Sequence, residues 1–264
     1  AAWMFTHHAQ HSRFRTVGEE VVFGEEDGLP PVVLTLHDGR KIALRGKIDR
    51  IDRWEGDEGV YLLVSDYKSS HRDIDPTRLW YGLQLQLLLY LQAACEGLDG
   101  NPAGAFYFTM KDPMVDTADV KEAAEKAIAK KLHLKGIVLA DVDVVEALDS
   151  EPGYSFTKIF NADSSVASSS DGYTPEEMAA LLAHAKKMAA ELADRIRSGE
   201  ITPSPAVISD WNACQWCDYA GVCKLDTSIP GLEKRELPPL SKQELLTRMA
   251  NDTDAPGNEE DTSP

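Results

Sequence analysis

Two aspartates and a lysine in the first third of this 264-residue chain have side-chain types and spacings that allow them to act together. Asp49 stands in residues 46–52, Gly-Lys-Ile-Asp-Arg-Ile-Asp, which alternate in the manner of a strand. Asp66 and Lys68 end the next expected strand, in Asp-Tyr-Lys-Ser-Ser. Because side chains two apart on a strand face the same side, we expect Asp66 and Lys68 to point into one site. Pairing of the two strands as a hairpin would bring Asp49 beside them.

Oxygen atoms dominate this expected site. Two carboxylates, Asp49 and Asp66, and the main-chain carbonyl of Tyr67 form the hard ligand set that Mg²⁺ prefers. Such an ion lowers the pKa of a bound water and stabilises charge on a phosphodiester during cleavage. Lys68 would orient or help deprotonate the attacking water and stabilise the developing negative charge. The alternative is a solvated surface ion pair, which a lone Asp-x-Lys more often forms; the upstream aspartate and the helix that follows favour the site.

A helix is expected to follow, from about Pro76 to Glu96, with Asp75 as its N-cap and Gly97 as its stop. The helical spacing places five residues on one face that should pack on the sheet: Leu79, Leu83, Gln86, Tyr90 and Ala93. A glutamine on such a face needs a specific partner, so Gln86 would hold a backbone phosphate or brace the site, or else be a satisfied core amide. Gln84, at the alternate position, is expected to face solvent.

Three of the four cysteines lie close together, in the spacing C-x2-C-x5-C of Cys214, Cys217 and Cys223. Cysteines this dense in an acidic chain without a secretory signal favour a metal or cluster site over disulfides. Three ligands leave a tetrahedral site incomplete. Cys95 is either the fourth ligand or a buried thiol at the end of the Gln86 helix.

Charge restricts the possible partners of the chain. It has 27 basic and 44 acidic residues, a formal net charge of −17 at pH 7, and five of the acidic residues fall in its last fourteen positions. Proteins that clamp nucleic acid by themselves are usually basic. Either the partner is not nucleic acid, or another polypeptide supplies most of the positive field.

The longest apolar run, residues 87–91, is far shorter than the roughly 20 residues that span a bilayer. With no secretory signal at the start, the cytoplasm is the expected location.

Around these motifs the pattern predicts alternating strands and helices. Asp38-Gly39 joins two β-prone runs as a hairpin. A charged helix is expected over 117–133, and a capped helix from Thr174 to about Ser198. Strands are expected at 17–23, 32–36, 41–44, 45–54, 60–67 and 103–110, with short apolar segments at 136–140 and 142–148.

The motif order Gly-x-Ile-Asp-Arg-Ile-Asp, Asp-Tyr-Lys-Ser-Ser and then Gln-x3-Tyr resembles the RecB-type branch of the PD-(D/E)xK nuclease superfamily. With the three cysteines, the chain is similar over roughly residues 3–226 to the C-terminal nuclease domain of AddB-type subunits of bacterial AddAB helicase–nucleases. The resemblance implies an α/β fold, a restriction-endonuclease-like core with a mixed β-sheet flanked by helices, followed by a cysteine-cluster segment.

The resemblance also implies a role for each motif. Asp49 and Asp66 would bind the metal, Lys68 would be the catalytic lysine, and Gln86 with Tyr90 would form the supporting helix motif. In AddB-like proteins, three clustered cysteines and a fourth far upstream hold a [4Fe–4S] cluster. The corresponding residues here are Cys214, Cys217 and Cys223. The upstream cysteine and an upstream helix bearing a histidine are missing, as expected of a chain that begins after them.

Other residues have two interpretations. His7, His8 and His11 would either replace the missing histidine or belong to a solvated segment. Glu20 either lines the site or is structural. Trp211 and Trp216 either pack around the cysteines or stack on bases.

Three parts are expected: a RecB-like nuclease domain over 1–200 with a helical segment inserted at about 111–172, an iron–sulfur segment over 201–228, and an extension over 229–264 that is acidic and disordered from about 251. The implied function is a Mg²⁺-dependent DNA exonuclease that acts on DNA ends with an AddA-like helicase–nuclease subunit in double-strand-break repair. The alternatives are a stand-alone RecB-like exonuclease of CRISPR adaptation and a non-catalytic Fe–S scaffold that binds DNA ends or a partner.

Overall fold

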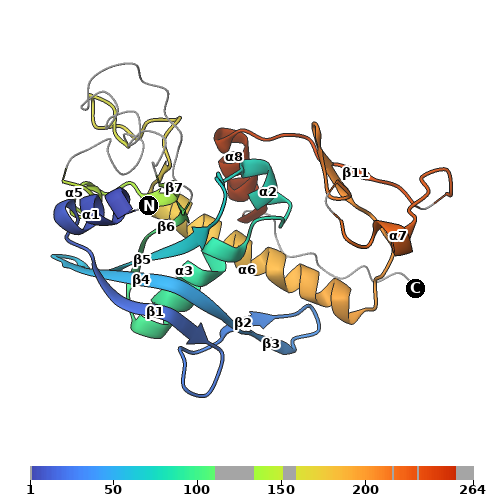
Figure 1. The fold of residues 1–264 in the computed structure, drawn as a ribbon, viewed down its shortest axis with the longest axis horizontal. Helices are drawn as coiled ribbons and strands as arrows, with labels where there is room; N and C mark the ends of the chain where they lie inside the picture. Colours follow the sequence, from blue (N-terminus) through green and yellow to red (C-terminus); the bar gives the residue numbers. More distant parts are fainter. Residues whose placement is uncertain (1, 111–133, 151–158, 216, 231, 254–264) are drawn as a thin grey trace.

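The computed structural model describes residues 2–110, 134–150, 159–215, 217–230 and 232–253. A six-stranded mixed sheet with the order β1-β4-β5-β6-β7-β8 forms its centre, with helices on both sides (Figure 1). The α/β fold and the mixed sheet expected from the sequence are thereby confirmed. The strands are β1 (Arg15–Phe23), β4 (Gly46–Gly56), β5 (Gly59–Lys68), β6 (Asn101–Thr109), β7 (Lys135–Leu139) and β8 (Gly172–Tyr173).

Strand direction follows the connections. β1, β4 and β5 are antiparallel neighbours, and tight turning at Gly59, whose φ is +130°, joins β4 to β5. β5 and β6 are parallel, because a helical crossover connects them. β7 then pairs antiparallel with β6 and parallel with β8. The carboxyl end of β5 therefore lies inside the sheet, beside the start of the crossover.

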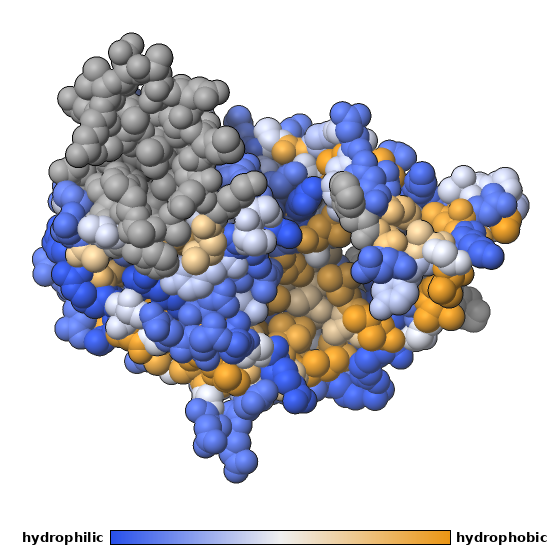
Figure 2. Space-filling model, in the orientation of Figure 1, coloured by the Kyte–Doolittle hydropathy of each residue, from blue (hydrophilic) through white to orange (hydrophobic). Residues whose placement is uncertain are grey.

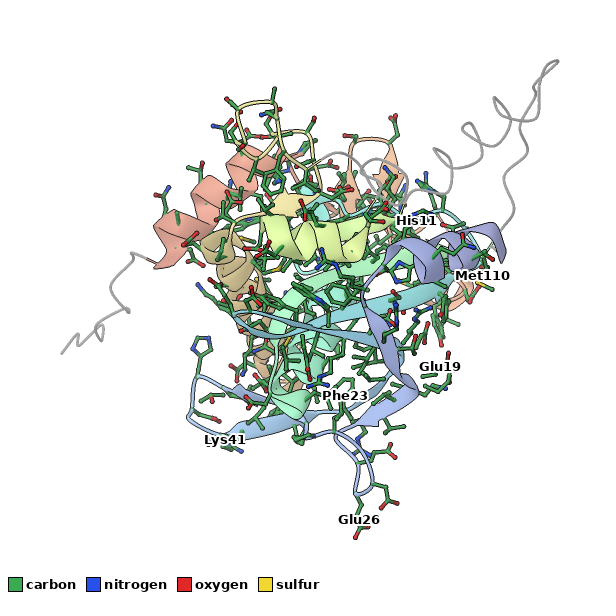
Figure 3. The ribbon with its side chains drawn as sticks, turned by 90° about the vertical axis from the view of Figure 1, so that its left-hand side faces the viewer. His11, Glu19, Phe23, Glu26, Lys41 and Met110 are labelled. Carbon is green, nitrogen blue, oxygen red and sulfur yellow. The ribbon has the colours of Figure 1, made fainter. Side chains whose placement is uncertain are left out.

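The Asp38-Gly39 hairpin is confirmed. It joins β2 (Val32–Thr35) and β3 (Lys41–Leu44), which pair antiparallel. Gly39 has a φ of +77°, a conformation that glycine adopts without strain. Figure 3 views this flank, with Lys41 on the hairpin and Glu26 at the tip of the loop between β1 and β2.

The single helix expected from Pro76 to Glu96 is wrong in its middle. The structure has two helices, α2 (Pro76–Trp80) and α3 (Gln86–Leu98), separated by five residues in which Gly82 has a φ of +74°. The chain leaves the helix there because Gln84 bonds the backbone of the preceding loop. Asp75 is the N-cap of α2, as expected, and accepts from two main-chain N–H groups.

The break also corrects part of the expected apolar face: Leu79 and Ala93 are buried, whereas Leu83 and Gln86 are not. α3 packs on β5 and β6 through a row of leucines and alanines, and the side chain of Gln86 is exposed. Leu83 belongs to the linker between the helices and is 40% exposed. The side chains of α3 that are buried are Leu87, Leu88, Leu91, Ala93 and Ala94.

Helices α1 (Ala2–His11) and α5 (Val142–Leu148) lie on one side of the sheet (Figure 1). Aromatic side chains pack near them. Trp54 stacks on Tyr61 at a ring-centroid distance of 5.5 Å and contacts Phe14 at 5.8 Å. Ser12 ties this layer together, since its hydroxyl donates to the carbonyl of Ala147 at 3.1 Å.

The segment expected as an insertion at about 111–172 contributes strand β7 to the sheet, and its helix α5 packs on β7 and β4. The helix expected over 117–133 lies outside the described residues. After β8 comes α6 (Pro175–Arg197), whose Thr174 cap and Glu177 form the capping box expected from the sequence. Gly199, at a φ of +76°, follows its end.

The C-terminal part lies to one side (Figure 1). It contains a small sheet of β9 (Ala206–Ile208), β10 (Trp211–Asn212) and β11 (Arg235–Glu236), the short α7 (Ala220–Cys223), and α8 (Lys242–Thr253), which packs on α6. Figure 2 shows a hollow with apolar side chains between this part and the main body. No helix in the described ranges combines the length and apolarity needed to cross a membrane.

Candidate active site

Asp49 lies at the point where β4 separates from β5. Main-chain pairing of the two strands runs from Gly56↔Gly59 to Arg50↔Ser65. One residue further, the side chain of Asp49 continues the pairing, because its Oδ2 accepts the main-chain N–H of Tyr67 at 2.8 Å. This hydrogen bond holds the Asp49 carboxylate at the end of β5, against Tyr67, the residue that follows Asp66.

Asp66 is the buried member of the set, with 3% of its surface exposed. Its Oδ2 lies 2.6 Å from Nζ of Lys68, an ion pair without the alignment of a hydrogen bond. Burial raises the pKa of Asp66, the Lys68 ammonium opposes this, and the negative charge of Asp49 raises the pKa further. The two carboxylates are therefore near enough to interact electrostatically.

This arrangement fits a divalent cation. Lys68 offsets one negative charge, but Asp66 Oδ2 has no aligned hydrogen-bond donor in the part of the chain that the structure describes, and Asp49 adds a second carboxylate nearby. A cation between Asp49 and Asp66 would bind this oxygen and relieve the repulsion between the two carboxylates. Tyr67, whose N–H holds Asp49, places its main chain between the two ligands.

Lys68 is held from two further sides. Its Nζ donates to Oε1 of Gln86 at 3.3 Å and lies 5.7 Å from the ring centroid of Tyr107. Gln86 in turn donates to the hydroxyl of Tyr90 at 3.0 Å. The first residue of α3 thus links the lysine to the helix, and the structure brings together Asp66, Lys68, Gln86 and Tyr90 in one connected chain of contacts.

Gln84 does not face solvent, so that expectation is wrong. Its Nε2 donates to the carbonyl of Asp73 at 2.8 Å, and its Oε1 accepts the N–H of Asp75 at 3.0 Å. A longer contact of 3.4 Å joins Nε2 to the hydroxyl of Tyr107, the ring beside Lys68. Gly82, which interrupts the helix two residues earlier, was the sequence signal for this change of direction.

Glu20 stands across from Asp49 in the pairing of β1 with β4, between Glu19↔Arg50 and Val21↔Ile48. It has a φ of +53°, which a residue with a side chain rarely adopts. Its carboxylate forms an ion pair with Lys47, and this contact raises the pKa of the Lys47 ammonium. Glu20 is therefore linked to the site through Lys47, whose charge also interacts with Asp49.

The motif that contains Asp49 holds a further aspartate, Asp52, which is buried and to which the sequence pattern assigns no role. Asp52 is 1% exposed and accepts hydrogen bonds from Thr16 Oγ1 at 2.8 Å and Arg50 Nε at 2.9 Å. Although burial lowers the pKa of Arg50, the Asp52 carboxylate raises it above the ordinary value, with a further contribution from a hydrogen bond to Tyr67. These contacts fasten β1 to β4 on the face of the sheet opposite Asp49 and Asp66.

The described amino-terminal histidines form no metal-holding group with the carboxylates. His11 ends α1, and its Nδ1 lies 3.4 Å from the hydroxyl of Ser150. The side chain of His7 lies outside the described residues, and His8 belongs to the same helix. Across the described ranges, no three His, Cys, Asp or Glu side chains form a group that could hold a metal ion. Within the described ranges, the carboxylates of the candidate site are thus Asp49 and Asp66.

The three clustered cysteines lie in the segment that ends with α7. Cys214, Cys217 and Cys223 are free and exposed, and as placed they form no metal-holding group in the described part of the chain. Burial raises the pKa of the Cys95 thiol to about 12, which disfavours the thiolate that a ligand must supply. This arrangement does not fit an iron–sulfur cluster. Trp216 lies outside the described residues.

Known proteins with similar sequences point to one family. The model of the PD-(D/E)XK nuclease superfamily matches residues 1–224. The ATP-dependent helicase/deoxyribonuclease B subunit of Alkaliphilus metalliredigens is 33% identical over 264 residues, which are 96% of this chain and 23% of that protein. The protein of the same name from Ruminiclostridium cellulolyticum is 36% identical over 240 residues, 86% of this chain and 21% of that protein. The chain spans about a quarter of the length of these curated relatives.

Proposed function

Because the chain belongs to the PD-(D/E)XK nuclease superfamily, we propose that it is the Mg²⁺-dependent DNA exonuclease module of an AddAB-type helicase–nuclease. Its similarity to the B subunits of ATP-dependent helicase/deoxyribonucleases supports this assignment. In this proposal an AddA-like subunit delivers the DNA strand, and the complex degrades DNA ends in the cytoplasm during double-strand-break repair. The formal net charge of −17 agrees with delivery of DNA by a partner.

The proposed chemistry is hydrolysis of a phosphodiester at the end of β5. Asp49 and Asp66 would bind the metal through their carboxylates, and Tyr67 through its main-chain carbonyl. A bound Mg²⁺ would supply charge stabilisation at the phosphate and a more acidic water. Because these ligands come from two neighbouring strands of one sheet, the sheet would hold the metal and the bound phosphodiester in a fixed position.

Lys68 is proposed to orient the attacking water and to stabilise the negative charge that develops on the phosphate. Its ammonium lies 2.6 Å from a ligand oxygen of Asp66, so it stands at the edge of the expected metal site. Gln86 limits the positions that this flexible side chain can take, and Tyr90 holds the glutamine. The two helix residues therefore act as positioning residues.

The single observation that carries the proposal is the convergence of Asp49, Asp66 and Lys68 on the end of β5. A non-catalytic scaffold would have no need of a buried carboxylate that is paired with a lysine and lies beside a second carboxylate. Such groups cost stability and are retained where they serve a site.

The iron–sulfur cluster remains a proposal for the intact protein. A fourth ligand would complete the four-cysteine ligation of such a cluster, and the described residues offer none. No step of the proposed hydrolysis depends on the cluster.

The test is degradation of end-labelled linear DNA by the full chain with Mg²⁺, comparing the unmodified protein with Asp66→Asn. We expect Asp66→Asn to remove cleavage, and we expect a chelator to remove it from the unmodified protein. Asp57→Asn is the matched control, because Asp57 is exposed in the turn between β4 and β5. Cleavage by Asp66→Asn at the unmodified rate would contradict the proposal and favour the scaffold.

A further inference from the structure

A second cavity adjoins the candidate active site. It has a volume of about 510 Å³ and is bounded by the loop that follows β5, by α2 and by β10. The wall between the two sites is shared, because Gln84 lines the cavity and also contacts Tyr107, the ring beside Lys68. The residues that matter here are Arg72, Asp73, Asp75, Arg78, Gln84 and Trp211.

One wall of this cavity consists of the guanidinium group of Arg78, which lies over the indole ring of Trp211. Cζ of Arg78 lies 4.6 Å from the ring centroid of Trp211. Arg78 comes from α2 and Trp211 from the C-terminal part of the chain, so the wall exists only where these parts meet. Flat guanidinium and indole surfaces are the groups on which unpaired nucleobases stack.

The cavity is lined by an exposed cation, Arg72, for which the described ranges show no ion pair. Gln84 lines the same cavity and contacts Tyr107, the ring beside Lys68. An anionic group in the cavity would therefore meet Arg72 close to the candidate active site.

The two acidic residues of the lining are already engaged. The carboxylate of Asp75 caps α2, accepting the N–H groups of Thr77 at 2.8 Å and Arg78 at 3.3 Å. Asp73 pairs with His71 at 3.1 Å and with Lys135 at 3.8 Å. These contacts, with the ion pair of Asp75 and Arg78 at 3.7 Å, offset part of the negative charge that would otherwise repel a phosphate bound at Arg72.

We propose that this cavity binds one unpaired nucleotide of the DNA strand being cut, with its base against the Arg78–Trp211 wall and the adjacent phosphate on Arg72. The proposal rests on the proposed nuclease function, which makes the occupant DNA. A base can stack in a cavity of this size only when it is not paired, so the occupant is single-stranded. In this proposal, the segment that precedes the cysteines has a function of its own, because it places Trp211 beside the substrate strand.

The test measures binding of a fluorescein-labelled oligothymidine to the full chain by anisotropy, with a chelator present so that nothing is hydrolysed. Trp211→Ala should weaken binding roughly 5- to 100-fold, the range expected for loss of one base–aromatic stack. Trp211→Phe keeps an aromatic face and should retain most of the affinity. Arg72→Gln should weaken binding and reduce the slope of log affinity against log salt by about one. Lys41→Gln, on the exposed hairpin shown in Figure 3, is the control and should bind normally.

Two results would overturn the subsite. One is unmodified affinity in both Trp211→Ala and Arg72→Gln; because Arg72 is exposed, its variant should fold. The other is an equal effect of Trp211→Ala on a duplex of the same length, whose bases cannot stack on the protein. Cleavage by Asp66→Asn instead concerns the nuclease proposal alone, since the binding measurement needs no hydrolysis.

Discussion

The main-chain N–H of Tyr67 donates to Oδ2 of Asp49 at 2.8 Å, where main-chain pairing between β4 and β5 has ended. This contact fixes a carboxylate at the edge of the site with one oxygen. In the described structure no hydrogen bond occupies its other oxygen, Oδ1, which can face a cation. Asp49 and Asp66 are thus placed by the sheet itself, without help from a flexible loop.

Replacing Lys68 by methionine should lower the rate of DNA cleavage about 100-fold or more, the usual effect of losing a positioned group that assists proton transfer. Methionine keeps the length of the side chain and removes the ammonium that lies beside Asp66. The measurement is the single-turnover rate of cleavage, with DNA affinity determined in parallel. Lys41→Met is the control. A loss of affinity that accounts for the whole effect would contradict the assigned role.

Substitutions of Asp49 and Asp52, which lie three residues apart in one motif, should differ in their effect on the stability of the fold. Asp52→Ala leaves Arg50 buried without its carboxylate, so the free energy of unfolding should fall by about 3–5 kcal/mol. Urea denaturation measures this change. Asp57→Ala, in the exposed turn, should change stability by less than about 0.5 kcal/mol. An Asp49→Asn variant less stable than Asp52→Ala would reverse the roles assigned to the two residues.

Gly136 allows β7 to lie against β6. A Cβ at this position would overlap the main-chain oxygen of Ala105 and the ring of Phe106. Gly136→Ala should therefore destabilise the sheet by about 1–3 kcal/mol or more. Gly221→Ala, where a Cβ meets open space, is the matched control for thermal unfolding. Equal melting temperatures of the two variants would contradict the placement of β7.

His184 should make stability depend on pH. It stacks on Trp80 at a centroid distance of 4.9 Å, and its Nε2 lies 3.1 Å from the Trp80 carbonyl. Burial lowers the pKa of His184 below 6.5, although contacts with the Trp80 and Leu79 main chain and the charge of Asp252 act in the opposite direction. As the pH falls, the unfolded chain therefore takes up the proton at a higher pH than the folded chain. The free energy of unfolding should then decrease as the pH falls through 6.5 towards the pKa of the folded state.

His184→Gln removes this proton uptake and keeps an amide for the Trp80 carbonyl. Urea unfolding at pH 7.5 and 5.5 should show a smaller loss of stability on acidification in the variant than in the unmodified chain. A difference of the opposite sign would show that His184 is charged in the folded state.

Much of the fold followed from local patterns. The strand at 60–67, the Asp38-Gly39 hairpin and the Thr174 capping box rest on signals within a few residues, and all three are present. The helix expected over 76–96 was wrong because its break depends on hydrogen bonds from Gln84 to a loop about ten residues earlier. The helical spacing of apolar residues cannot predict such contacts.

The same distinction applies to the site. The convergence of Asp66 and Lys68 follows from the two-residue period of a strand, and the structure has them 2.6 Å apart. The contacts of Asp52 with Thr16 and of Trp211 with Arg78 join distant segments. No spacing in the sequence predicts them, because they arise from the packing of β1 on β4 and of the C-terminal part on α2.

Titration of Mg²⁺ into the full chain, followed by calorimetry, tests most directly whether Asp49 and Asp66 form a cation site. The account predicts binding by the unmodified protein, little or none in Asp66→Asn or Asp49→Asn, and unchanged binding in Asp57→Asn. Equal Mg²⁺ affinity in the unmodified protein and in both site variants would contradict it.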